Sequence, residues 1–366
     1  MTATTNHSKQ HREPLVRISK RGDLIWWKAW LIRLAAIVLA MLVCAGLIVL
    51  ITGYNPIEVY VSMFKGSFGS TRKVWITMQK TALLLCISLA VTPAFKMKFW
   101  NLGAEGQVLM GACATAGCML AWGDKMPIGL LIPVMLIAAV AAGTIWALIP
   151  AVCRAKWGTN ESLFTLMMNY VAMQIVSYCI TFWENPIGSN TVGIINSATS
   201  GGWLPSMFGQ KYLLNILVVA LITILMYIYL KYSKHGYEIA VVGESQNTAR
   251  YIGINVKKVI VRTVALSGAL CGLAGLLLVA GTDHTISTNT VGGQGFTAIM
   301  VSWLAKFNPL VMALTSFLLI FLGRGAGEIA TAFRLNESVS DILTGLSNGR
   351  GHHSVFHHWL RVLCQL

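Results

Sequence analysis

Long stretches without a charged side chain constrain this sequence more than any other feature. Five stretches of about 20 residues lack Asp, Glu, Lys and Arg: 34–57, 126–153, 162–183, 212–230 and 263–282. A helix of about 20 apolar residues is long enough to cross the hydrocarbon core of a bilayer. Only 11% of the residues are charged, whereas ordinary soluble domains carry roughly 25%. A water-facing surface therefore cannot be assembled from this chain.

Weaker candidates add to these five spans. Residues 106–123 and 307–323 are slightly shorter but equally free of charge, and residues 81–95 lie between two lysines. Residues 296–305 have the length of a half-helix or re-entrant piece, and a last segment begins near residue 342. Lipid cannot satisfy free backbone groups, so spans of this kind are helices. We predict an all-α, polytopic integral membrane protein with about 8–10 transmembrane helices.

The basic residues predict the orientation. Placing the N-terminus in the cytoplasm puts most of the 28 Lys and Arg residues on the inner side of the membrane. The predicted organisation is a basic cytoplasmic segment at 1–30, a transmembrane domain at 31–346 and a C-terminal tail at 347–366. The net charge of +15 then faces the anionic inner surface of the plasma membrane. Charges scattered over short loops do not form a nucleic-acid groove.

Motifs for chemistry are missing from the sequence. It contains no nucleotide-binding G-x-x-x-x-G-K-[ST] loop, no His-Glu-x-x-His and no Gly-x-Ser-x-Gly. We predict no catalytic residue, no cofactor and no metal site, and we interpret most cysteines as small apolar core residues. Nearly bare spans favour a passive conduit, because ion-driven carriers usually need buried acids. A secondary, ion-coupled transporter of small polar solutes stays an alternative, and so does a multispan membrane enzyme.

Two polar motifs open membrane helices. In the first, N-L-G-A-E-G-Q at 101–107, Asn101 is a predicted N-cap. Glu105 and Gln107 either belong to a tightly packed helix start or line a polar path. In the second, T-N-E-S-L-F-T-L-M-M-N-Y at 159–170, Thr165 and Asn169 are four residues apart and share a helix face. Their polar groups face either a neighbouring helix or the solute.

The segment 231–262 is the one long charged stretch between two apolar helices. Gly236 is predicted to break the preceding helix, and 238–242 and 245–251 are predicted to form two short amphipathic helices separated around Gly243. Such a segment either docks on a soluble partner or is a solvated connector, and its sparse Gly and Ser content favours docking. The candidate contact residues are Gly236, Tyr237, Glu238, Gly243, Asn247, Arg250 and Gly253.

The polar stretch 282–297 follows a glycine-rich span in which Gly268 and Gly272 form G-x-x-x-G, a close-packing face. We predict that this stretch is a discontinuous segment lining a cavity, because irregular backbone at membrane depth is tolerated where it is buried or wetted. Gln294 is the candidate solute contact within it.

These motifs resemble the permease subunits of bacterial ABC importers for nucleosides and simple sugars, in the branched-chain amino acid/ribose permease superfamily. The similar segments are the two polar motifs above, G-Y-E-I-A-V-V-G-E-S-Q-N-T-A-R-Y-I-G-I-N-V at 236–256, and G-G-Q-G-F-T-A-I-M-V-S-W-L-A-K-F-N-P at 292–309. The likeness covers roughly residues 34–346.

The resemblance implies a translocation path formed by two permease subunits, identical or related. Two cytoplasmic ATPases would drive it by contacts on residues 236–254, and an extracellular substrate-binding lipoprotein would deliver the solute. ATP hydrolysis is expected on the separate ATPase subunits, and the location is the bacterial plasma membrane.

The tail departs from that family. After Leu346 the family continues with a hydrophobic span, whereas this chain ends in a histidine-rich stretch. Its histidines resemble a metal tract, but we interpret 347–366 as a divergence of reading frame or gene model without a family function. They are His352, His353, His357 and His358.

Overall fold

The computed structural model describes residue 49 and residues 55–333. The chain divides into two compact units, Met1–Ser62 with Ile329–Leu366, and Met63–Glu328. The described residues of the first unit are helical apart from Asn55 and Phe333. The predicted N-terminal segment and the tail at 347–366 lie outside the described residues. The rest of the description concerns Met63–Glu328.

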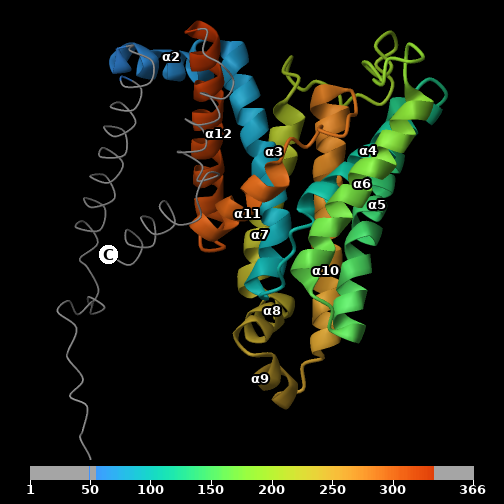
Figure 1. The fold of residues 1–366 in the computed structure, drawn as a ribbon, viewed down its shortest axis with the longest axis vertical. Helices are drawn as coiled ribbons and strands as arrows, with labels where there is room; N and C mark the ends of the chain where they lie inside the picture. Colours follow the sequence, from blue (N-terminus) through green and yellow to red (C-terminus); the bar gives the residue numbers. More distant parts are fainter. Residues whose placement is uncertain (1–48, 50–54, 334–366) are drawn as a thin grey trace, which may run out of the picture. The chain divides into compact units, whose positions relative to one another are not determined.

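The described residues form α-helices and one π-helical turn, with no β-sheet, which confirms the predicted all-α class. Figure 1 labels the helices. In chain order they are α2 (Pro56–Phe68), α3 (Thr71–Lys96), α4 (Ala104–Trp122), α5 (Ile128–Trp157), α6 (Glu161–Trp183), α7 (Leu213–Tyr232), α8 (Lys234–Glu244), α9 (Gln246–Tyr251), α10 (Val256–Leu278), η1 (Val279–Asp283), α11 (Gln294–Leu304) and α12 (Pro309–Ala332).

Six of the described helices are long and apolar enough to cross a membrane. They are α3, α5, α6, α7, α10 continued by η1, and α12. The structure therefore confirms a polytopic arrangement. The predicted count of about 8–10 stays a prediction, because the first and last expected spans lie largely outside the described residues. The half-length segment expected at 296–305 is α11, a helix of 11 residues.

Burial separates an inner layer from an outer one. Most of the apolar stretches of α3 and α10 are buried inside the protein, whereas only 22%, 28% and 33% of those of α5, α6 and α7 are buried. The exposed side chains on the outer helices are large and apolar, such as Ile137, Phe182 and Leu225. Such surfaces are stable in lipid, which is as apolar as the side chains themselves. We expect α5, α6 and α7 to face lipid or another membrane subunit.

Glycines bring α4, α5 and α10 into close contact, as the G-x-x-x-G pattern predicts. A Cβ atom built on Gly272 would lie 2.1 Å from the backbone oxygen of Ala139 in α5. One built on Gly111 of α4 would lie 2.5 Å from the Cα of Gly272. A methyl group at either position has no room. The three backbones meet here without intervening side chains.

The two ends of the helix bundle differ. At one end the connection 184–212 lies against the end of α10, with a bond of 2.8 Å from the Ile195 amide to the His284 carbonyl and stacking of Trp203 on His284 at 3.8 Å. At the other end lie α8 and α9, close to the turn between α3 and α4 (Figure 1). The candidate coupling segment therefore lies at the opposite end from the longest connection.

Candidate functional site

The segment between α7 and α10 consists of two short helices with serine caps. The Ser233 hydroxyl accepts a hydrogen bond from the Gly236 amide at the start of α8. The Ser245 hydroxyl accepts one from the Thr248 amide at the start of α9. Serine is a preferred N-cap because its side chain satisfies an otherwise free amide of the first turn. Two helices were predicted here, and two are present.

The predicted positions of the breaks were wrong. α7 ends at Tyr232 and Ser233 starts α8, so Gly236 does not break a helix but lies in the first turn of α8. Gly243 lies inside α8, and the break falls at Ser245. Glycine is needed at both positions because the backbone lies too close to a neighbouring carbonyl for a side chain. A Cβ on Gly243 would lie 2.2 Å from the Lys96 carbonyl oxygen, and one on Gly236 2.5 Å from that of Tyr229.

One face of the segment is buried in a separate hydrophobic cluster. Ile239 and Val242 of α8 and Ala249 of α9 are almost completely buried. They lie in one cluster with Phe99 of the turn after α3 and with Val259 of α10, and α8 contacts α3, α7 and α10. The burial of several apolar side chains fixes the segment against three membrane helices. A force on α8 and α9 would therefore reach these helices directly.

An ion pair reinforces this attachment. Arg262 Nη2 of α10 lies 2.7 Å from Glu238 Oε2 of α8, and both side chains are partly buried. The hydrogen bond from Arg262 lowers the pKa of Glu238 and is the largest effect. Burial raises this pKa by a smaller amount, and the charges of Arg262, His235 and Lys234 each lower it further. The carboxylate is the form that this site stabilises. Glu238 thus attaches α8 to α10 and is not a free contact residue.

The opposite face of the segment is exposed. Tyr251 is 93% exposed and Tyr237 63% exposed, and Asn247, Arg250 and Gly253 are exposed as well. Asn247, Arg250 and Tyr251 border a shallow hollow of about 460 Å³ on α9. Exposed aromatic and arginine side chains on a rigid element are the residue types that dominate protein–protein contacts. The seven predicted loop residues thus separate into an exposed group and a packing group (Gly236, Glu238 and Gly243).

The five polar candidates gather around the start of α4. Asn169 of α6 accepts a hydrogen bond of 2.8 Å from the Gly106 amide and donates one of 2.8 Å to the Leu102 carbonyl. Thr165, one turn earlier, accepts a bond of 3.1 Å from the Leu102 amide. The predicted common face of these two residues is confirmed, and it faces α4. Both side chains are buried, and their hydrogen bonds join α6 to α4 and to the turn before it.

Asn101 was predicted to cap α4, and this was wrong. The N-cap is Gly103, which has no side chain to offer. Asn101 Oδ1 accepts bonds from the Gly103 amide and from Gln107 Nε2, each 3.1 Å long. Its Nδ2 lies 3.2 Å from Ser267 Oγ in α10. Asn101 therefore joins the turn before α4 to α10, a contact 166 residues away that local capping rules do not reveal.

Glu105 connects α4 to α11. Its Oε1 accepts a hydrogen bond of 2.7 Å from the Gly293 amide, and its Oε2 accepts one of 2.8 Å from the Gly295 amide. The carboxylate is nearly fully buried. Gln294 lies between these two glycines and is half-buried. The irregular backbone predicted for this stretch is confirmed for 284–293, which follow η1 and precede α11.

Sequence reasoning missed the polar contacts that hold the other end of α11. Ser302 Oγ donates to the Ser88 carbonyl of α3 at 2.9 Å, and the Thr92 hydroxyl lies 3.3 Å from Ser302 Oγ. Isolated Ser and Thr residues in apolar helices carry no distinctive sequence pattern. The only signal was their polarity within a span, which points to a buried partner.

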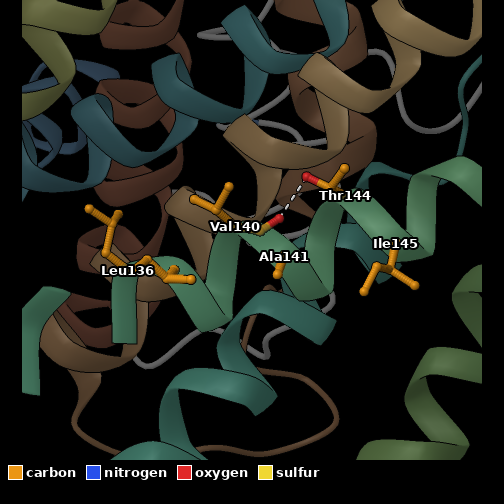
Figure 2. A pocket seen from close by; sticks show the side chains of 6 residues that line it. Leu136, Val140, Ala141, Thr144 and Ile145 are labelled. Atoms are coloured by element: carbon orange, nitrogen blue, oxygen red, sulfur yellow. Dashed lines mark hydrogen bonds between the residues drawn. The ribbon is translucent and has the colours of Figure 1, made fainter. Parts of the chain in front are cut away.

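A hollow on α5 is not a polar site. It measures about 590 Å³ and is lined by Leu136, Ile137, Val140, Ala141, Thr144 and Ile145. Figure 2 shows that its one hydroxyl, from Thr144, is bonded to the Val140 carbonyl of the same helix at 2.7 Å. An apolar lining of this kind suits lipid tails or a neighbouring membrane helix.

Comparison with known proteins identifies the family. The model of the branched-chain amino acid transport system / permease component family matches residues 75–347. The chain belongs to this family. The match ends at residue 347, close to Leu346, where the resemblance of the sequence to such permeases also ends. As a permease with several apolar spans, the protein is a multi-pass component of the plasma membrane.

Individual permeases are similar over most of their length. A guanosine ABC transporter permease protein of Bacillus subtilis is 31% identical over 319 residues, which cover 86% of this chain and 91% of that protein. A nucleoside ABC transporter permease protein of Lactococcus lactis is 30% identical, over 81% of this chain and 83% of its own. A glucose ABC transporter permease protein of Haloferax volcanii is 28% identical, over 84% and 83%.

Family membership assigns the chain to transport. Permeases of ABC transporters work with ATPase subunits and with a substrate-binding protein. The exposed face of α8 and α9 is available to a soluble partner, and the polar residues around the start of α4 lie inside the membrane domain.

Proposed function

We propose that this chain is one of two permease subunits in an ABC importer for a nucleoside. The second permease subunit is identical or related, two cytoplasmic ATPases supply the energy, and an extracellular lipoprotein delivers the solute. Relatives at 31% and 30% identity carry guanosine and nucleoside in their names. A relative at 28% is named for glucose, so a simple sugar is the second candidate solute.

The observation that carries the proposal is that α8 and α9 have one packed face and one exposed face. One face of the segment is packed against the ends of three membrane helices. The other presents Tyr237, Asn247, Arg250 and Tyr251 to solvent. A solvated connector has no reason to combine a buried apolar face with an ion pair to α10. A docking element needs both, because it must receive a push and transmit it.

Burial suggests different roles for the polar residues inside the domain. Glu105, Gln107, Thr165 and Asn169 are buried and bonded to backbone or side-chain groups of neighbouring elements. In this proposal these four residues hold together the helices that form the translocation path. Gln294, half-buried at the start of α11, is the proposed solute contact. An amide offers both a donor and an acceptor to the hydroxyl or ring nitrogen groups of a neutral nucleoside.

The test is uptake by the reconstituted importer. The permease, its ATPases and its binding protein are placed in proteoliposomes and supplied with radiolabelled guanosine. Uptake is expected with ATP on the ATPase side, competition by excess adenosine or inosine but not glucose, and no uptake with an ATPase variant that lacks its catalytic residue. Competition by glucose alone would make a sugar the solute. Uptake driven by a proton gradient without ATP would identify a secondary transporter instead.

A further inference from the structure

The start of α11 has an unusual cap. Gly293 is the N-cap residue, with a φ of 75°, and it makes no side-chain cap bond. The first amides of a helix have no partner within the helix and need one when buried. Two of these amides, of Gly293 and Gly295, donate to the two carboxylate oxygens of Glu105 at 2.7 and 2.8 Å. The capping side chain comes from another helix, 188 residues earlier.

The carboxyl group of Glu105 lies at the N-terminal end of the α11 helix dipole. Each of its oxygens accepts a backbone N–H, and bonds of this length from backbone amides to a carboxylate belong to the strong class. The positive end of the α11 dipole adds to the attraction. Gly295 allows the approach, because a Cβ there would lie 2.6 Å from the Glu105 nitrogen and 2.8 Å from its Oε2.

A folding role alone does not account for a charge at this place. A Ser or Asn at position 293 would cap α11 from within its own chain segment, without the cost of burying a carboxylate among membrane helices. A cap from α4 does something that a local cap cannot. It fixes the position of α11 relative to α4, and it does so at the open end of an interrupted helix, where transporters contact their solutes.

We propose that Glu105 is a positioning residue for transport. Its carboxylate holds the first turn of α11 on α4, so that Gln294 keeps its place when the permease changes between its two access states. The contacts of Ser302 with Ser88 and Thr92 hold the other end of α11 on α3, so α3, α4 and α11 move together. This inference deepens the proposed function and rests on it.

The test uses the complete importer in proteoliposomes, with Glu105→Gln and Gly295→Ala as variants. The first keeps the shape of the side chain and removes the charge and one acceptor. The second keeps the charge and displaces the turn. Each is expected to lower the maximal uptake rate of guanosine per assembled complex at least about tenfold. KM should stay within about twofold, because solute capture belongs to the binding protein, and solute transported per ATP should fall with the rate.

Two further variants of the same protein are the matched controls. Gly323→Ala in α12 adds the same methyl group where nothing lies within 4 Å. Thr115→Val removes a hydroxyl from α4 that is bonded at 2.9 Å to the Gly111 carbonyl of its own helix. Both are expected to keep the uptake rate within about twofold of wild type. Hydrogen exchange is measured on all proteins, and the amides of 293–297 should exchange faster in Glu105→Gln and in Gly295→Ala but not in the two controls.

The outcomes separate the inference from the proposed function. Normal uptake per assembled complex in both variants would overturn the positioning role, whatever their thermal stability. A wild-type importer that takes up no guanosine would refute the proposed solute, and hydrogen exchange would then decide alone. Unchanged protection of 293–297 in Glu105→Gln would overturn the inference in that case as well.

Discussion

At the scale of single residues, the sequence predicts polar positions better than it predicts their partners. Asn160 caps α6, because its Oδ1 accepts bonds from the Ser162 and Leu163 amides. Both partners lie within three residues, so local rules suffice. Glu105 bonds to α11, and Asn101 adds to its local bonds one to Ser267 of α10. Those partners depend on the tertiary arrangement, which single-sequence rules do not contain.

Glu238 gives a prediction at this scale. Replacing it with Gln removes the charge that Arg262 stabilises, so Glu238→Gln should lower the free energy of local opening of α8 by roughly 1 kcal/mol at pH 7. Hydrogen exchange of the α8 amides measures this value. Glu244→Gln, at the exposed end of the same helix, is the control and should change little.

The pH dependence has a definite sign. The pKa of Glu238 is lowered in the folded protein, chiefly by the hydrogen bond from Arg262. The stabilisation is therefore present above the unfolded pKa of about 4.3 and is lost as the pH falls through the lower folded value. Wild type and Glu238→Gln should converge in acid. A difference that persists well below pH 4 would contradict the ion pair as its source.

At the scale of elements, the pattern of apolar residues located the helices, and packing placed their ends. The predicted span at 81–95 is only the C-terminal part of α3, which runs from Thr71 to Lys96. Lys80 and the polar residues near it lie within the helix, because the helix begins before its most apolar part. Glycine was the least reliable guide. Gly236 and Gly243 lie inside α8, where close contact and not helix termination requires them.

Gly243 supplies the prediction for this scale. In Gly243→Ala the new methyl group would meet the Lys96 carbonyl oxygen at 2.2 Å, so α8 must move away from the end of α3. Overpacking of this kind costs about 1–3 kcal/mol, and ATP-driven uptake is expected to fall at least about tenfold. Gly129→Ala, where nothing lies within 4 Å, is the matched control. Equal uptake in the two variants would show that the position of α8 against the end of α3 does not affect transport.

At the scale of the whole molecule, composition was the strongest predictor. A charged fraction of 11% and several uncharged stretches require a membrane, and a membrane requires helices. The six long apolar helices of the described residues agree with that reasoning. The way in which α4, α5 and α10 meet through glycines was only partly foreseen, because G-x-x-x-G marks a contact face without naming the partner helix.

The central claim for the whole molecule is that motion is transmitted to the membrane helices through α8 and α9. These helices are packed on the ends of α3, α7 and α10 and are exposed on the other side. In the proposed importer the chain supplies the path, and the ATPase partner hydrolyses ATP. Every other proposal, including the role of Glu105, depends on that transfer of motion.

Photo-crosslinking from α9 tests this claim most directly. Tyr251, which is 93% exposed, is replaced by p-benzoylphenylalanine, and the assembled importer is irradiated in its membrane. The same replacement at Phe208, 89% exposed in the connection at the opposite end of the bundle, is the control. The account predicts an adduct with the ATPase subunit from position 251 and none from position 208. An ATPase adduct from 208, or labelling of position 251 by an impermeant reagent outside the cell, would contradict it.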